Sequence, residues 1–389
     1  MGSNLEVESL KSEEQSLYDC YVTASYRLSD MKGKVVAITG TTEGSIGYYT
    51  ALAAVSKGAK LLLLLNRDTD RSYEAEQKIK AHAKATDQEC FVRTVVCDLS
   101  NLYLVKNAAL AVNETVADGY GGLDVLVNCA GVCALPDERT VDGFDVQMQV
   151  NMLSHFLLTK LLMDSLELAA ETRGEARVVM HTCAFRGIPN RMLKPEMFQI
   201  CPEGTLGGDG KWFLGDLVKQ KGPFSRYQQS KLANASFSMA LHMKLQAVGS
   251  KVKSIVVDPG FAKTNLFGRN STSSEPDLIS KTSARFRNLL SQSPANGSIP
   301  TLVASFGPAN LCQSGDFFLR VAQSTGLADK SVAGGVPVKR GGERLACHPL
   351  NIECVWTSCE KVLQVKFDIS RRSTYKMVED DSDYVSVDD

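Results

Sequence analysis

The sequence lacks long apolar stretches and any strong excess of charge. No purely apolar run is longer than Leu61–Leu65, whereas a membrane-spanning helix needs about 20 such residues. The formal net charge is −1 at pH 7 over 389 residues, so the chain offers no broad field to nucleic acid or to an anionic membrane. We expect no transmembrane segment and no nucleic-acid partner.

The first 30 residues lack the marks of a targeting signal. They carry Glu6, Glu8, Glu13 and Glu14 but no apolar core, unlike a secretory or an arginine-rich transit peptide. Glu6 also stands where a myristoylation signal needs Ser or Thr. We therefore expect an N-terminal extension over residues 1–30 and a cytoplasmic location.

Regular cysteine spacing is also missing, although the chain has 11 cysteines. Disulfide frameworks and zinc sites depend on characteristic intervals between cysteine and histidine residues. The group Cys347, His348, Cys354 and Cys359 matches no common zinc pattern. We expect free thiols and no metal site.

Glycine is concentrated where the first apolar strand ends. Val35–Thr39 runs into three glycines, and a helical pattern follows. Glycine allows the sharp turn and leaves room for a diphosphate against the first N–H groups of the helix, whose dipole favours an anion. We predict a dinucleotide-binding loop with Ser45 as a further donor to the diphosphate; its members are Gly40, Thr42, Gly44, Ser45, Ile46 and Gly47.

Strand-like and helix-like segments alternate from Lys34 onward. A parallel return between neighbouring strands needs a crossover, which usually packs as a helix on the sheet. The pattern predicts an α/β fold with a Rossmann-type, doubly wound parallel sheet in a single domain over residues 31–365. Strands are expected at Val35–Thr39, Lys60–Leu65, Phe91–Cys97, Leu123–Val127, Arg177–His181 and Lys253–Val257.

Three segments do not fit this alternation. Residues 185–225 are rich in Pro and Gly and form a long insertion loop, and residues 261–300 are expected to form a substrate lid with an apolar underside. Residues 366–389 are acidic, and we expect them to be a disordered tail because their charges repel.

Tyr227 and Lys231 are four residues apart at the start of a predicted helix, so their side chains share one face. A phenol has an ordinary pKa near ~10, and a neighbouring ammonium group together with an oxidised nicotinamide favours its phenolate. Tyr227 is therefore a candidate general acid and base. It would give a proton to a carbonyl oxygen in reduction and take one from a hydroxyl in oxidation.

The second predicted strand ends in Leu65-Asn66-Arg67. An acidic residue at this place binds the ribose 2′-hydroxyl of NAD, whereas the 2′-phosphate of NADP needs a cation. Arg67 offers a guanidinium fork, and Arg71 is a possible substitute, although Asp68 could pair with Arg67. The pattern favours NADP, or NADPH, over NAD.

Four further motifs follow the glycine loop in order. The motifs are Asp98-Leu99, Asn128-Cys129-Ala130-Gly131, Tyr227-Gln228-Gln229-Ser230-Lys231 and Pro259-Gly260-Phe261-Ala262-Lys263-Thr264. Together they make nearly all of residues 33–310 resemble the short-chain dehydrogenase/reductase family. The stretch Asn151–Thr159 narrows the resemblance to its retinol dehydrogenase and WW-domain oxidoreductase branch, here without a WW domain.

The resemblance implies a role for each motif. Asp98 and Leu99 would hold the adenine, the segment Asn128–Gly131 would line the adenine ribose, and the segment Pro259–Thr264 would border the nicotinamide. Lys231 would bind the nicotinamide ribose, and Asn151 would hold a water in the proton path. By analogy with the family, the protein would be a homodimer or homotetramer.

One departure concerns the serine that the family places at the end of the fifth strand to bind the substrate oxygen. Cys183 aligns there, and a thiol is a weak donor. Thr182 could supply a hydroxyl only if the strand end is twisted or bulged. Loss of an oxyanion donor typically costs about a hundred- to a thousand-fold in rate. His181 is expected in the core.

The leading prediction is an NADP-dependent oxidoreductase of class EC 1.1.1.- that acts on a carbonyl or alcohol. The substrate would be small and apolar because the lid would contribute Leu266, Phe267, Phe286 and Leu289. An NADP-binding regulator that lost efficient chemistry through Cys183 is the alternative. The long insertion also allows a carbonyl reductase or a protochlorophyllide-reductase-like enzyme.

Overall fold

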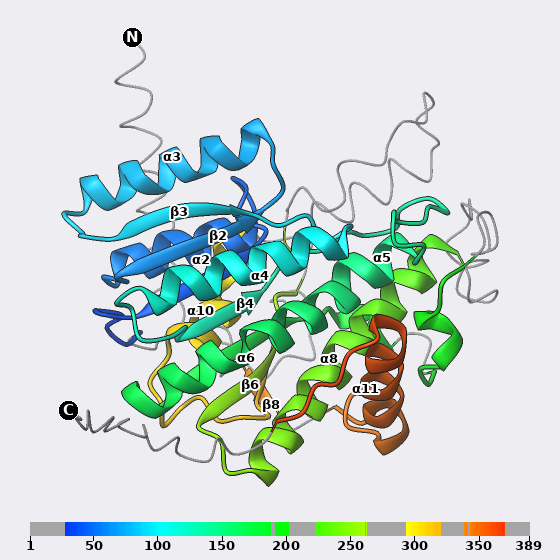
Figure 1. The fold of residues 1–389 in the computed structure, drawn as a ribbon. Coiled ribbons are helices and arrows are strands. Elements are labelled where there is room, and N and C mark those ends of the chain that lie inside the picture. The colour runs from blue at the N-terminus through cyan, green and yellow to red at the C-terminus, as the bar shows by residue number, and fades with distance from the viewer. Residues whose placement is uncertain are drawn as a thin grey trace, which may run out of the picture.

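The computed structural model describes residues 28–187, 191–201, 222–260, 262, 293–319, 338–340 and 343–369. Within these residues, one eight-stranded sheet has the order β3-β2-β1-β4-β5-β6-β7-β8 (Figure 1). All neighbouring strands are parallel except β7 and β8. The strands are β1 (Val35–Thr39), β2 (Leu61–Asn66), β3 (Phe91–Val96), β4 (Val125–Asn128), β5 (Ala176–His181), β6 (Val252–Asp258), β7 (Phe317–Leu319) and β8 (Val338–Arg340).

Helices cover both faces of the sheet, which is why the central strands are apolar throughout rather than alternating. In β1, Val35 and Ala37 face one hydrophobic core, while Val36 and Ile38 face the other. The first core contains α4 (Leu102–Ala117), α6 (Ser154–Arg173) and α8 (Pro223–Ala247). The second contains α2 (Ile46–Ser56), α3 (Asp70–Ala85) and α10 (Pro294–Phe306). The predicted Rossmann-type α/β fold is confirmed.

A C-terminal helix, α11 (Pro349–Leu363), packs against α8 (Figure 1, orange-red). Its Trp356 stacks on Phe367 with 5.0 Å between ring centroids and on Phe237 of α8 at 6.0 Å, and it meets Phe156 of α6 edge-on at 5.4 Å. Large aromatic rings contribute strongly to a core when they are buried in this way. The cluster therefore fastens the C-terminal segment to α6 and α8.

Four short helical elements lie between the longer helices and strands. They are α5 (Val146–Met148), the π-helical turn η1 (Gln149–Leu153), and the 3-10 turns η2 (Ala184–Gly187) and η3 (Pro195–Phe198). The last two belong to the predicted insertion loop, of which residues 188–190 and 202–221 lie outside the described residues.

Several predictions about segments fall wholly or partly outside the described residues. Most of the predicted lid does so, including Leu266, Phe267, Phe286 and Leu289, but its last residues begin α10, where Ile299 is fully buried. The N-terminal extension before residue 28 and the acidic tail after residue 369 lie outside as well. Among the described helices, none combines the length and hydropathy required to cross a bilayer.

Candidate active site

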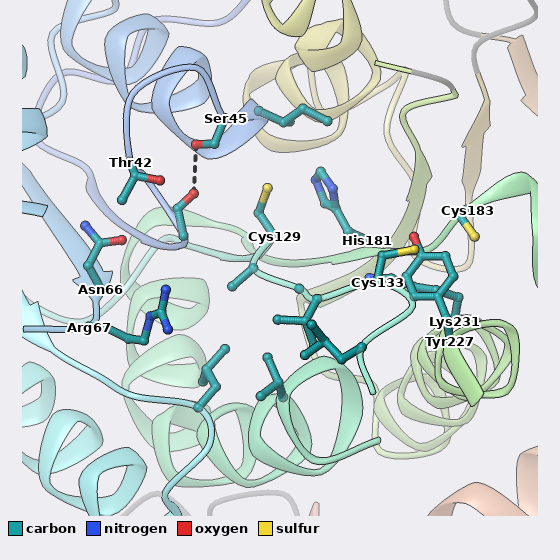
Figure 2. Close-up of a pocket in the computed structure, with 18 of the residues that line it drawn as sticks. Thr42, Ser45, Asn66, Arg67, Cys129, Cys133, His181, Cys183, Tyr227 and Lys231 are labelled. Atoms are coloured by element: carbon teal, nitrogen blue, oxygen red, sulfur yellow. Dashed lines mark hydrogen bonds between the residues drawn. The ribbon is translucent and has the colours of Figure 1, made fainter. Parts of the chain in front are cut away.

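A cavity of about 480 Å³ lies at the carboxyl ends of the parallel strands. Loops after several strands form its walls, as expected for a ligand site in an open α/β sheet. Figure 2 shows Asn66 and Arg67 towards one end and Tyr227, Lys231 and Cys183 towards the other. The volume is in the range of small-molecule sites.

The glycine loop after β1 is closed by contacts that only glycine permits. Gly40 has a φ of +75°, and a Cβ there would lie 2.9 Å from Ala130; a Cβ on Gly47 would lie 2.4 Å from the Gly40 carbonyl oxygen. Gly44 also has a φ of +75°. Gly44 and Gly47 do not line the cavity, so they shape the loop rather than face a ligand.

Ser45 is the N-cap of α2. Its Oγ accepts a hydrogen bond from the Tyr48 N–H at 3.0 Å and donates to the Gly40 carbonyl oxygen at 2.9 Å (Figure 2). In this structure the hydroxyl proton goes to Gly40, so a bond from Ser45 to a diphosphate would have to replace this one, and the predicted role stays a prediction. Ser45, Thr42 and Ile46 all line the cavity.

Asn66 and Thr41 bind each other. The Thr41 N–H donates to Asn66 Oδ1 at 2.8 Å, and Asn66 Nδ2 donates to Thr41 Oγ1 at 2.7 Å. Asn66 therefore supports the glycine loop from β2. The predicted competition of Asp68 for Arg67 is not observed, since the Asp68 carboxylate accepts from the Tyr73 hydroxyl at 3.0 Å.

Arg67 and Arg71 border the end of the cavity where Asn66 lies. Arg67 is exposed and Arg71 is half-buried in the first turn of α3, and within the described residues neither makes an ion pair. Arg67 and Arg71 are thus available to an anion. Asp98 and Leu99 line the cavity nearby, and one Asp98 oxygen accepts from Ser100.

Tyr227 and Lys231 lie on α8 and are almost fully buried. The Lys231 ammonium is 5.9 Å from the centre of the Tyr227 ring. Burial raises the pKa of Tyr227 well above its ordinary value, with the neighbouring Cys183 and Cys133 adding to the rise, and burial lowers the pKa of Lys231. In the protein alone the ammonium does not make Tyr227 a phenolate; the expectation that an oxidised nicotinamide and the ammonium together favour the phenolate stays a prediction. The phenol keeps its proton at neutral pH.

Cys183 and Thr182 point in different directions, as neighbours at the end of a strand do. Thr182 Oγ1 donates to the Lys231 carbonyl oxygen at 2.6 Å, so its hydroxyl ties β5 to α8 and is not free for a substrate. Thr182 lines the cavity, but to replace a catalytic serine its hydroxyl would have to leave the Lys231 carbonyl oxygen. Cys183 interacts with the Tyr227 hydroxyl, and burial raises the pKa of its thiol to about 11.

Asn151 lies in η1 and does not line the cavity. Its Nδ2 donates to the Val132 carbonyl at 3.0 Å and to Ser230 Oγ at 2.9 Å, while its Oδ1 accepts from the Val132 N–H at 2.8 Å. Both amide protons are used, so the Asn151 side chain would offer a water only a lone pair of Oδ1. A Cβ on Gly131 would be 3.0 Å from this oxygen and 3.2 Å from Lys231 Nζ, so the glycine permits close packing.

Asn128 also departs from its predicted role. Its Nδ2 donates to Thr159 Oγ1 of α6 at 3.0 Å, and it does not line the cavity. The residue fastens β4 to α6 behind the site, so its assignment to the cofactor wall is wrong. Ala130 and Gly131, by contrast, line the cavity, as do Pro259 and Gly260. Thr264 lies outside the described residues.

Sequence reasoning missed a buried network behind the cavity. Thr39 Oγ1 accepts from the N–H groups of Cys129 and Ala130 at 2.9 and 3.0 Å and contacts His155 Nε2 at 3.1 Å, and His155 Nδ1 contacts the Asn151 carbonyl oxygen at 3.0 Å. Burial lowers the pKa of His155 to about 4, so the ring is neutral. A polar residue at the end of an apolar run, such as Thr39 after Val35–Ile38, is the feature of the sequence that could have revealed this network.

His181 is buried at the end of β5, as expected, where its Nε2 contacts Thr301 Oγ1 at 3.0 Å and burial lowers its pKa to about 3. Within the part of the chain that the structure describes, no cluster of His, Cys, Asp or Glu could hold a metal ion. Cys347, Cys354 and Cys359 are free thiols.

Comparison with known proteins places these features in a family. A sequence profile described as short chain dehydrogenase matches residues 34–188. An uncharacterized oxidoreductase of Schizosaccharomyces pombe is 31% identical over 305 residues, which cover 76% of this chain and 79% of the relative. The chain belongs to the short-chain dehydrogenase/reductase family.

Two further similar proteins agree with the assignment of this short-chain dehydrogenase to its family. Retinol dehydrogenase 12 of Homo sapiens is 32% identical over 244 residues, covering 62% of this chain and 65% of the relative, which supports the predicted branch. A crystal structure titled as a putative uncharacterized protein from Mycobacterium Paratuberculosis matches with a TM-score of 0.57 and 25% identity, covering 88% of this chain and 97% of that one. The family binds a nicotinamide dinucleotide, and the chain is therefore an oxidoreductase of a small-molecule substrate.

Proposed function

We propose that this short-chain dehydrogenase uses NADP to interconvert a carbonyl and an alcohol on a small apolar substrate, with Tyr227 as the general acid and base. The proposal rests on the fact that the two ends of one cavity carry different kinds of side chain. Tyr227, Lys231 and Cys183 gather at one end, and Arg67 and Arg71 border the other. One elongated ligand with a redox ring and a phosphate would engage both groups.

The residues present fit a bound dinucleotide. The positions of Gly40 and Gly47 leave no room for a side chain, and the start of α2 directs its dipole towards the cavity, where a diphosphate is favoured. Asp98 would accept from the adenine amine, and Arg67, with Arg71, would bind the 2′-phosphate. Gly260 would border the nicotinamide, which when bound supplies or accepts the hydride.

Tyr227 would move the proton. Because burial keeps its phenol protonated at neutral pH, it would donate to a carbonyl oxygen during reduction without a preceding proton transfer. The positive ring of an oxidised nicotinamide would favour the phenolate that oxidation needs. Lys231 would hold the nicotinamide ribose, and the Cys183 thiol would give the substrate oxygen a second, weaker donor.

The substrate wall is largely apolar. Leu135, Val146, Val150 and Phe185 line the cavity, and the Phe185 ring meets Phe224 edge-on with centroids 4.9 Å apart. Such walls favour a hydrocarbon or aromatic body over a sugar or an acid. The likeness to retinol dehydrogenase 12, whose name gives an apolar alcohol, supports the same substrate class.

The test is a hydride-transfer assay with NADPH and NADH across a panel of apolar aldehydes and ketones. We expect turnover with NADPH, a loss of at least about a hundred-fold in kcat for Tyr227→Phe, and little change for Tyr103→Phe, an exposed tyrosine on α4 that serves as the matched control. Turnover unaffected by Tyr227→Phe would contradict the proposal.

Cys183 favours a second candidate, a regulator that binds NADP without efficient chemistry, because a thiol stands at the donor position. NADPH binding without turnover across the whole panel would select this function. The carbonyl-reductase and protochlorophyllide-reductase readings depend on the insertion loop, whose residues 202–221 lie outside the described residues. A cytoplasmic location and a homo-oligomeric state stay predictions.

A further inference from the structure

Arg186, in η2, is a buried cation that joins four parts of the chain. Its Nη1 donates to the Cys183 carbonyl oxygen at 2.5 Å and to Asp258 Oδ2, at the end of β6, at 2.6 Å. Its Nε pairs with Glu343. The guanidinium also lies over the Phe317 ring of β7, 4.5 Å from the centroid. One side chain thus contacts segments up to 157 residues away.

The partners of Arg186 border the reactive end of the cavity. Asp258 binds Arg186 through Oδ2 and accepts the Gly260 N–H at 3.0 Å through Oδ1, so the carboxylate also holds the loop that follows β6. Gly260 and Cys183 both line the cavity. Arg186 therefore binds the two loops on either side of the place where Tyr227 faces a substrate.

The charges around Asp258 also give Arg186 an electrostatic effect on the reactive end of the cavity. Arg186 faces the carboxylate from η2 and Lys231 lies within its field on α8, while Glu343 meets Arg186 from the C-terminal segment. The charge of Asp258 contributes to the raised pKa of both Tyr227 and Cys183. Without Arg186, a buried carboxylate near the reactive phenol would lose its direct partner.

We propose that Arg186 is a positioning residue for the reaction: it fixes the loops after β5 and β6 around Tyr227 and couples them to the C-terminal segment that contains Glu343. The inference rests on the proposed function. Glu343 lies beyond residues 34–188, the part matched by the family profile. The segment after Glu343 leads into α11, which packs on the helix that carries Tyr227 and Lys231.

The test compares Arg186→Met, Arg186→Lys, Asp258→Asn and the double variant Arg186→Met/Asp258→Asn. Arg177→Met is the matched control, because Arg177 is also buried and paired with a glutamate, Glu175, but lies at the opposite end of β5. The readouts are kcat, KM for NADPH, the pH dependence of alcohol oxidation, and amide hydrogen exchange at Gly260.

We expect Arg186→Met to lower kcat/KM at least about tenfold and to move the rise of oxidation to higher pH, because the unpaired Asp258 disfavours the Tyr227 phenolate. The double variant should return the pH dependence towards that of the wild type, since it removes the unpaired charge. Arg186→Lys should be intermediate, and Arg177→Met should lose stability with kinetics unchanged. If Arg186→Met does not fold, Glu343→Gln should lower kcat/KM by a smaller factor because it loosens Arg186, and it should not move the rise of oxidation to higher pH, because Asp258 keeps Arg186 as its partner.

The outcomes separate this inference from the proposed function. If the wild type turns over but Arg186→Met keeps its kinetics and pH dependence, the inference is overturned; if Arg186→Met does not fold, an unchanged kcat/KM in Glu343→Gln overturns it. If the wild type shows no turnover, the proposed function fails, and amide hydrogen exchange then tests the positioning role of Arg186 on its own. Exchange at Gly260 at least about tenfold faster in the Arg186 or Glu343 variant than in Arg177→Met supports the positioning role, and equal exchange removes it.

Discussion

Replacing Cys183 by serine should speed the proposed reduction of a carbonyl substrate. The thiol contacts the Tyr227 hydroxyl, and because burial raises its pKa to about 11, it is a neutral, weak donor at pH 7. A hydroxyl at the same backbone position, which Arg186 fixes through the Cys183 carbonyl, would be a full donor to the developing oxyanion.

The expected gain follows from what one oxyanion donor contributes. Losing such a donor costs about a hundred- to a thousand-fold in rate. A thiol retains part of this effect, so Cys183→Ser should raise kcat by about ten- to a hundred-fold, or about 1.4 to 2.8 kcal/mol in the activation free energy. Cys183→Ala, which removes a donor that is already weak, should lower kcat by less than about tenfold.

The assay follows NADPH consumption under saturating cofactor with one apolar aldehyde. Cys312→Ser is the matched control, because Cys312 is buried, donates to the Val303 carbonyl oxygen at 3.1 Å and lies away from the cavity. It should leave kcat unchanged. A folded Cys183→Ser variant with kcat at or below that of the wild type would refute the reasoning, since residue 183 would then not face the substrate oxygen.

Three other perturbations have defined outcomes. Replacing Arg67 and Arg71 by alanine should raise KM for NADPH about ten- to a hundred-fold while KM for NADH stays unchanged, as parallel titrations of the two cofactors would show. The pKa values of about 4 for His155 and about 3 for His181 lie below the pKa of a histidine in the unfolded chain, so the unfolded state binds more protons. The free energy of unfolding should therefore fall by a few kcal/mol as the pH drops from about 6.5 towards 4. Equal urea midpoints at both pH values would contradict this. Trp356→Ala should cost about 3 to 5 kcal/mol in unfolding free energy through the cavity it leaves among the aromatic rings, measured by denaturant titration.

The strands and the glycine turn could be predicted because their signals are local. β1 matches its predicted range, and β2 is displaced by one residue. The sequence also indicated that Tyr227 and Lys231 share one face of a helix, because four residues make about one helical turn. These features depend on spacing within a short window.

Side-chain direction at strand ends could not be predicted, since it depends on the twist of the sheet and on neighbours far away in the sequence. Asn128 turns behind the cavity towards Thr159, and Thr182 turns towards α8. The pair formed by Arg186 and Asp258 spans 72 residues and belongs to no local motif. Such contacts can be identified only from the folded structure.

The central claim is that Tyr227 protonates a carbonyl while a nicotinamide in this cavity supplies the hydride. NADPH labelled with deuterium at C4 tests it directly, with the alcohol product analysed by mass spectrometry. We predict one deuterium in the product of the wild-type enzyme and no product above background from Tyr227→Phe. Bound NADPH with no transfer of deuterium to any aldehyde or ketone tested would contradict the claim.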